Sequence, residues 1–183
     1  MNISHFSNEK TANTNLISVK QRAAYLNSIG SHKVLELCVG PSLQRLQQEY
    51  SKYGIICYGN DIDIRWKEFY PLGKWLIGDA LKLASYATNF DTIIFAPPLS
   101  KGCSGKREDS LFIKDINPSY IDFLNAYKQY IGKKNIVLVL PGKTLSIKSE
   151  RNEMYKLLSQ IKCSYQIIPL TNGCVKYVDI LLR

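Results

Sequence analysis

Short runs of apolar residues alternate along the chain with stretches in which apolar residues recur every three or four positions. The apolar runs predict five strands, over residues 33–38, 55–59, 74–77, 91–96 and 135–140. The helical periodicity between them predicts helices over residues 18–30, 43–54, 64–70, 80–88, 117–132 and 149–161. Because strands that alternate with helices form parallel sheets covered by helices, the pattern favours an α/β fold.

The last part of the chain departs from this alternation. Two apolar segments, 165–170 and 175–182, are separated only by the short stretch 171–174, which contains Asn172 and Gly173. An Asn-Gly turn between two such segments is typical of a β-hairpin. The sheet is therefore predicted to end in an antiparallel pair.

Three residues are predicted to begin helices. Ser18 and Ser149 each precede an amphipathic stretch as N-cap residues, and Asn117 precedes Pro118, a residue suited to the first helical position. Residues 1–17 are rich in Asn, Ser and Thr and lack periodicity, so we expect a flexible N-terminal arm there and a single domain over residues 18–183.

Composition limits the classes of protein that are possible. No apolar run reaches the length of a transmembrane helix, and residues 1–17 are too polar for a signal peptide. The five cysteines form no CxxC pair and the two histidines belong to no ligand set, so we expect neither a metal site nor a disulfide framework. Reduced thiols indicate a cytoplasmic protein.

The charge of the chain suggests a kind of partner. The formal net charge is +9 and the sequence pI is about 9.3. Such an excess of cations favours a polyanionic partner, most often nucleic acid.

The segment Lys33–Ser42 carries the most specific chemistry of the chain. A short strand that contains the acid Glu36 runs into a turn at Gly40, and a helix follows from Pro41. This arrangement lets a ligand approach the backbone and the N-terminus of a helix closely. Taken alone, the segment could also be an ordinary strand–helix turn with a buried acid.

Three later strands end in further polar or Pro-rich signals. Asp61 follows the second strand, Asp79 and Ala80 follow the third, and Ala96, Pro97, Pro98 and Leu99 follow the fourth. In this order, the four strand ends resemble those of S-adenosylmethionine-dependent methyltransferases of the Rossmann-like class. The resemblance covers residues 18–183 and implies a mostly parallel seven-stranded sheet that ends in an antiparallel hairpin, with helices on both faces.

The resemblance implies a role for each residue at the first three strand ends. Glu36 would hold the ammonium group of the cofactor, S-adenosylmethionine, and Gly40 is the middle glycine of the family's glycine-rich turn. Cys38 and Ser42 stand where the family has its other two glycines. Asp61 would bind the ribose hydroxyls, and Asp79 with Ala80 would bind the adenine.

The loop after the fourth strand resembles the Pro-Pro loop of amino-group methyltransferases. By this resemblance, Ala96, Pro97, Pro98 and Leu99 form the catalytic loop, in which backbone carbonyls accept hydrogen bonds from the target amino group. Ala96 and Leu99 replace the polar and the aromatic side chain that such loops carry.

Cations follow the fourth and fifth strands. We interpret Lys101, Lys106, Arg107 and Lys143 as a basic substrate rim that could hold phosphate groups. A solvated loop would explain the same residues, because Glu108 and Asp109 partly cancel the charge.

The sequence therefore predicts a methyltransferase that acts on a base of RNA or DNA. Methylation of a small molecule is one alternative. The other is a protein that uses the same fold to bind nucleic acid or a partner without catalysis. The sequence indicates no oligomeric state.

Overall fold

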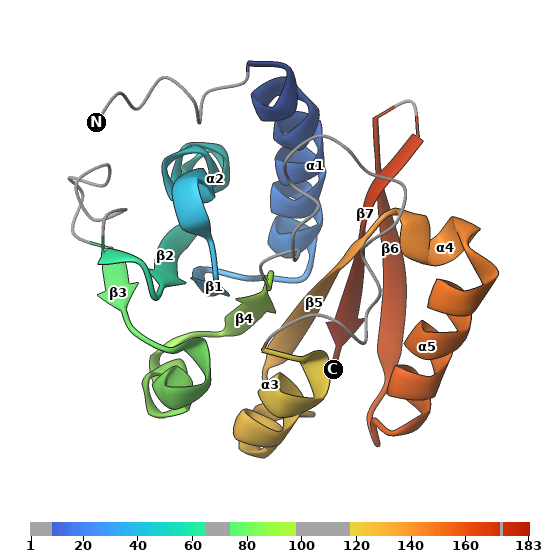
Figure 1. Ribbon diagram of the computed structural model, residues 1–183. Helices are drawn as coiled ribbons and strands as arrows, with labels where there is room; N and C mark the ends of the chain where they lie inside the picture. Colours follow the sequence, from blue (N-terminus) through green and yellow to red (C-terminus); the bar gives the residue numbers. More distant parts are fainter. Residues whose placement is uncertain (1–8, 65–73, 98–117, 173) are drawn as a thin grey trace.

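The computed structural model describes residues 9–64, 74–97, 118–172 and 174–183 (Figure 1). These residues form seven strands: β1 (Lys33–Leu37), β2 (Ile56–Asp61), β3 (Trp75–Ile77), β4 (Thr92–Phe95), β5 (Asn135–Pro141), β6 (Tyr165–Asn172) and β7 (Cys174–Leu182).

All seven strands belong to one sheet with the order β3-β2-β1-β4-β5-β7-β6. The neighbouring pairs among β1 to β5 are parallel, and β7 runs antiparallel to both β5 and β6. The predicted mostly parallel sheet and its terminal hairpin are therefore confirmed. The order reverses between β1 and β4, where the chain passes from one half of the sheet to the other.

Helices cover both faces of the sheet (Figure 1). The helical segments of the described residues are α1 (Glu9–Ser28), η2 (Gly40–Ser42), α2 (Leu43–Ser51), η4 (Ala80–Asn89), α3 (Tyr120–Ala126), η7 (Lys128–Tyr130), α4 (Lys143–Ser146) and α5 (Lys148–Ser159). α1 and α2 pack on one face, and η4, α3 and α5 pack on the other. None of the described helices is long and apolar enough to cross a membrane.

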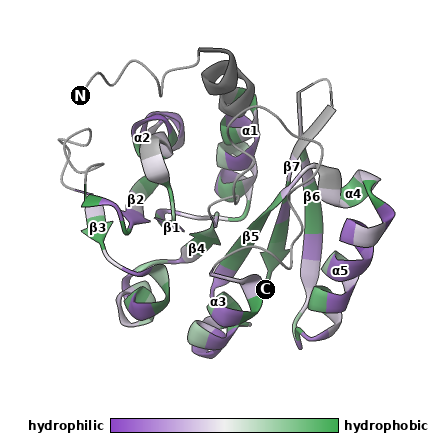
Figure 2. Ribbon diagram, viewed as in Figure 1, coloured by the Kyte–Doolittle hydropathy of each residue, from purple (hydrophilic) through white to green (hydrophobic). Residues whose placement is uncertain are grey.

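Alternate residues of each central strand point to opposite faces. In β4, Ile94 packs in the core beneath α1 and α2, whereas Ile93 and Phe95 pack in the other core. Both kinds of position are apolar because both faces are covered, which gives β4 and β5 the almost continuous hydrophobic colour of Figure 2.

Three predicted helix starts are wrong. α1 begins at Glu9, so Ser18 lies inside the helix and is buried. No Gly or Pro interrupts residues 9–29, and the helix extends through the polar segment. The predicted arm therefore overlaps a helix over residues 9–17, while residues 1–8 lie outside the described residues.

α3 and α5 also begin elsewhere than predicted. Ser119 caps α3, and its hydroxyl accepts a bond from the Asp122 N–H at 3.1 Å in a capping box. Asn117 lies outside the described residues. α5 begins at Lys148, and Ile147 occupies the N-cap position instead of the predicted Ser149. The short helix α4 fills the residues between β5 and this start.

Candidate functional site

The turn after β1 has an unusual backbone. Cys38 has a φ of 62° and Gly40 a φ of 49°, both in the left-handed region, whereas Ser42 has a φ of −86°. Left-handed backbone favours glycine. The geometry thus explains why a glycine would suit position 38, and it shows that position 42 needs none.

Asp61 ties the end of β2 to this turn. One of its carboxylate oxygens accepts the Gly40 N–H at 2.8 Å, and the other accepts the Asp63 N–H at 2.9 Å. Each carboxylate oxygen can accept a further bond. Asp61 therefore holds the turn and still has the capacity to bind hydroxyl groups.

Gly59 lets the helix α2 lie close to β2. A Cβ atom at this position would come within 2.5 Å of the Leu43 side chain. The sequence analysis did not single out Gly59, because an isolated glycine in a strand does not reveal which element packs on it.

A second polar cluster fixes the turn after β3. The Asp79 carboxylate caps η4 by accepting the Leu81 N–H at 3.0 Å. The buried Asn60 amide donates to the carbonyls of Leu76 at 3.0 Å and Gly78 at 2.9 Å. Asp79 is therefore held at the same edge of the sheet as Asp61, and Asn60 is a supporting residue that the sequence analysis missed.

The thiol of Cys38 lies among these groups. Burial raises its pKa to about 12, and the negative charges of Asp61 and Asp79 contribute to the increase. The thiol therefore stays neutral near pH 7 and does not supply a thiolate nucleophile.

A buried group of charges occupies the face of the sheet beneath α1. The Arg22 guanidinium donates to Asp179 through Nε at 2.6 Å and through Nη2 at 2.7 Å, and its Nη1 lies 3.4 Å from the Glu36 carboxylate. The Tyr25 hydroxyl donates to Asp179 at 2.6 Å, and the Tyr50 hydroxyl donates to Glu36 at 2.9 Å. We call these five residues the ionic cluster.

The pKa values of the ionic cluster reflect its burial. Burial raises the pKa of Glu36, and the charge of Arg22 and the Tyr50 bond only partly oppose this shift. Burial would lower the pKa of Arg22, but the charge and hydrogen bonds of Asp179 outweigh it, so that this pKa is well above its ordinary value. Arg22 is therefore permanently cationic between two buried acids.

A cavity of about 170 Å³ opens beside the ionic cluster, at the carboxyl ends of β1 and β4. Five residues of the predicted site or its loop border it: Glu36, Cys38, Ser42, Ala96 and Pro97. Its remaining lining residues come from α1, α2, β5, β7 and the turn after β1, namely Ser18, Val19, Arg22, Val39, Leu46, Val139, Leu140 and Tyr177. Gly40, Asp61, Asp79 and Ala80 lie at the same edge but are not among the described lining residues.

Other predicted site residues cannot be placed in this way. Pro98, Leu99, Lys101, Lys106 and Arg107 lie outside the described residues. The backbone of Lys143 begins α4, directly after β5, and its side chain is not described. Arg151, which follows in α5, donates to the Leu145 carbonyl at 3.0 Å.

The sequence analysis missed Arg22 and Asp179, although both leave a signal. Arg22 recurs with Val19 and Leu26 at helical spacing, so a charged residue lies within an apolar stripe. Asp179 lies in the otherwise apolar run 178–182. A charge at a buried position needs a partner, so each residue indicates a buried ion pair but does not identify the other member.

The candidate site lies where folds of this kind bind ligands. In open α/β sheets, the crevice at the carboxyl ends of the strands, where the strand order reverses, is the usual ligand site. The cavity lies at this reversal, between β1 and β4.

The fold is similar to the folds of several solved methyltransferases. One solved structure that it resembles is the plantazolicin methyltransferase BpumL in complex with a triazolic desmethylPZN analog and SAH, with a TM-score of 0.64, 16% identity, and 98% of this chain and 88% of that chain covered. The chain has the Rossmann-like methyltransferase fold.

The fold is also similar to those of two further methyltransferases. Magnesium protoporphyrin IX methyltransferase (ChlM) from Synechocystis PCC 6803 with bound SAM matches with a TM-score of 0.60 and 15% identity over 93% of this chain and 80% of that chain. A SAM-dependent methyltransferase from Archaeoglobus fulgidus matches with a TM-score of 0.54 and 13% identity over 90% and 94%. No protein-family model and no curated protein matches the chain.

Proposed function

We propose that the protein is an S-adenosylmethionine-dependent methyltransferase that acts on a base of RNA or DNA. The main support is the cavity at the reversal of strand order, which combines a buried carboxylate, a buried guanidinium and an unpaired hydroxyl. The methyltransferase fold, and the SAM and SAH named with ChlM and BpumL, support the cofactor part of this proposal.

The polar groups of the cavity fit the amino-acid end of S-adenosylmethionine. Ser18 is 2% exposed, and its hydroxyl has no hydrogen-bond partner among the described residues. A buried hydroxyl without a partner is costly, so it suits a site that a polar ligand completes. Ser18 and Arg22 would bind the carboxylate of the cofactor, and Glu36 would bind its ammonium group.

The rest of the cofactor would lie along the carboxyl ends of β2 and β3. Asp61 would accept bonds from the ribose hydroxyls with its remaining lone pairs. Asp79 and Ala80 would bind the adenine, with the Asp79 carboxylate accepting from the amino group.

The protein's own contribution to the reaction would be positioning. When bound, the cofactor supplies a methyl group on a sulfonium, which is already activated for transfer. Ala96 and Pro97 border the cavity, and backbone carbonyls of the loop that continues through Pro98 and Leu99 would orient the target nitrogen. The restricted backbone of consecutive prolines keeps such carbonyls in place.

Nucleic acid is proposed as the substrate on the ground of charge. The net charge of +9 is available to neutralise phosphate groups. Lys101, Lys106, Arg107 and Lys143 would form the basic rim at the mouth of the site.

A small-molecule substrate is the second candidate. The structures similar to this fold include enzymes named for plantazolicin and for magnesium protoporphyrin IX.

Calorimetric titration with S-adenosylhomocysteine tests the cofactor proposal. We expect wild-type protein to bind it, and Asp61→Ala to weaken binding by about 1–3 kcal/mol through the loss of the ribose bonds. Glu153→Ala, which removes a carboxylate from the distant helix α5, is the charge-matched control and should bind as wild type. A folded wild-type protein that does not bind would leave only the non-catalytic alternative.

Label transfer from S-adenosylmethionine distinguishes the substrates. The protein is incubated with labelled cofactor and with total RNA, DNA, protein and metabolite pools. Label in RNA or DNA supports the proposal, and label in metabolites alone supports the small-molecule enzyme.

A further inference from the structure

A second and larger cavity lies at the opposite edge of the sheet from the candidate site. Its volume is about 660 Å³. The lining residues that matter here are Lys33, Asp91, Lys133, Lys134, Asn135 and Arg183. Lys33 and Asn135 begin β1 and β5, Asp91 precedes β4, and Arg183 follows the antiparallel β7, so all of them gather at the amino ends of the parallel strands.

This cavity is basic. Four of its lining residues are cations, and Asp91 is the only acid among its described lining residues. One oxygen of Asp91 accepts the backbone N–H groups of His32 at 2.8 Å and Lys33 at 2.9 Å, and its other oxygen is buried without a hydrogen-bond partner among the described residues. Within the described part of the chain, the ion pairs join other side chains and leave these four cations without a carboxylate partner.

Two of the cations are held in place by the fold. The Lys33 ammonium lies over the rings of Tyr58 and Phe90, 5.2 and 5.1 Å from their centroids. The Lys134 ammonium donates to the carbonyls of Thr88 and Phe90 and lies 5.7 Å from the centroid of the Tyr130 ring. Side chains that are already ordered lose little conformational entropy when they bind a ligand.

The other two cations are exposed. Lys133 and Arg183 line the cavity and are exposed, and no side-chain bond is found for either among the described residues. Two further exposed lysines, Lys128 and Lys162, line the neighbouring groove at the ends of α3 and α5. The positive charge therefore continues along this edge of the molecule.

We propose that this amino-edge cavity binds the phosphate backbone of a nucleic-acid strand. Backbone phosphates bind to ordered and exposed cations that have no carboxylate partner. The aromatic rings of this cavity contact Lys33 and Lys134 and are not offered for stacking on bases. The site is therefore expected to bind phosphate groups without preference for the base sequence. The proposal rests on the nucleic-acid part of the proposed function and does not depend on cofactor binding.

The distance between this cavity and the candidate site indicates the length of the substrate. β5, with seven residues, runs from this edge to the candidate site and spans about 20 Å. A ligand that reaches both edges is therefore an oligonucleotide and not a mononucleotide.

Fluorescence polarisation with a labelled mixed-sequence RNA oligonucleotide tests the proposal. The variant Lys133→Glu/Arg183→Glu should bind about tenfold or more weakly than wild type at low salt, and its affinity should depend less steeply on salt concentration. The control Lys52→Glu/Lys156→Glu has the same net charge, and its substitutions lie outside the cavity on exposed side chains. It should lose clearly less affinity.

Three other results would contradict the proposal. The proposal would be overturned if both double variants lost RNA affinity equally, or if wild-type protein did not bind RNA. It would also be overturned if a mononucleotide at equal phosphate concentration displaced the RNA. If the thermal unfolding of Lys133→Glu/Arg183→Glu shows that it is not folded, Lys133→Gln and Arg183→Gln are compared singly with Lys52→Gln. Titration of the same proteins with S-adenosylhomocysteine should be unchanged, so a failure of the cofactor proposal is seen separately.

Discussion

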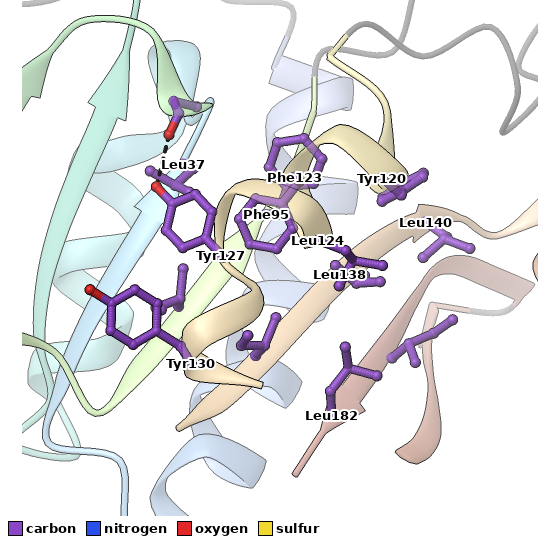
Figure 3. Packing of buried hydrophobic residues seen from close by; sticks show 14 of the residues in the cluster. Leu37, Phe95, Tyr120, Phe123, Leu124, Tyr127, Tyr130, Leu138, Leu140 and Leu182 are labelled. Carbon is purple, nitrogen blue, oxygen red and sulfur yellow. Dashed lines mark hydrogen bonds between the residues drawn. The ribbon is translucent and has the colours of Figure 1, made fainter. Parts of the chain in front are cut away.

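The two faces of the sheet are stabilised in different ways. The face beneath α3 and η4 is packed with aromatic rings: Phe123 stacks on Phe95 with centroids 4.3 Å apart and on Tyr127 with centroids 4.4 Å apart (Figure 3). The face beneath α1 carries the ionic cluster, in which Arg22 bridges two buried carboxylates.

The difference indicates that the face with the ionic cluster contributes less to the free energy of folding than the aromatic face. Aromatic packing gains free energy from every buried ring, whereas buried charges must first lose their hydration, and an ion pair seldom repays that loss fully. Arg22 and Glu36 of the ionic cluster line the small cavity, whereas Phe95, Phe123 and Tyr127 are not among its described lining residues. We therefore expect mutations in the ionic cluster to affect ligand binding as well as stability, and mutations on the aromatic face to affect mainly stability, except where a ring bonds to a residue of the candidate site, as Tyr127 does.

Removal of the arginine should have the largest effect. Arg22→Leu leaves Glu36 and Asp179 as two buried acids without a cation, and the free energy of unfolding should fall by about 3–5 kcal/mol. Chemical denaturation measures this loss. Arg22→Lys keeps the charge but loses the two parallel bonds to Asp179, so it should lose less; equal stability of Arg22→Leu and wild type would show that the cluster does not need its cation.

A matched mutation on the aromatic face should have a smaller effect. Phe123→Leu keeps most of the apolar volume but removes two ring stacks, and the free energy of unfolding should fall by about 2 kcal/mol. Because Phe123 lies away from the cavity, affinity for S-adenosylhomocysteine should not change under conditions where the variant is folded. A large loss of affinity would contradict the separation of the two faces.

The sequence predicts one of these faces better than the other. Tyr120, Phe123 and Tyr127 recur at helical spacing within the predicted helix 117–132, and all three are buried, because such a pattern indicates the side chains that face a core. It could not show that Arg22 meets Asp179, since the two residues lie 157 positions apart and only the sheet order brings them together.

The candidate site divides in a similar way. The strand ends that carry Glu36, Asp61 and Asp79 follow from local patterns, and the structure brings them to one edge of the sheet. The backbone of Cys38 and the role of Gly59 depend on contacts between elements, which local patterns do not contain. The polar composition of residues 9–17 predicts an arm, but no Gly or Pro stops a helix there, and α1 begins at Glu9.

The acid of the ionic cluster should make stability depend on pH. Burial raises the pKa of Glu36 above 4.5, its ordinary value. The folded state therefore holds this proton more firmly than the unfolded state, and the contribution of Glu36 to stability is fully present below the unfolded pKa and is lost as the pH rises through the folded pKa.

Glu36→Gln should remove this loss. The variant should melt a few degrees above wild type near neutral pH, and the difference should vanish toward the acidic end of the range. Thermal unfolding across acidic to neutral pH measures this. If Glu36 binds the ammonium group of the cofactor, the more stable variant should also bind S-adenosylhomocysteine more weakly; a variant that is both less stable and equally tight would contradict both expectations.

The smallest expected effect concerns a hydrogen bond between the aromatic face and the turn that carries Asp79. The Tyr127 hydroxyl donates at 2.8 Å to the carbonyl of Ala80, the residue after Asp79 (Figure 3). The Tyr130 hydroxyl donates at 2.8 Å to the carbonyl of Ala84, further along η4. Tyr127→Phe and Tyr130→Phe each remove one such bond, and each should lower the free energy of unfolding by about 1 kcal/mol. Only Tyr127→Phe should also weaken S-adenosylhomocysteine binding, by a few-fold, because the turn that carries Asp79 loses a support. Calorimetry on the two variants decides between a local and a general effect: equal affinities would show that the turn holds Asp79 through Asn60 and the η4 cap alone, and that the aromatic face has no part in the site.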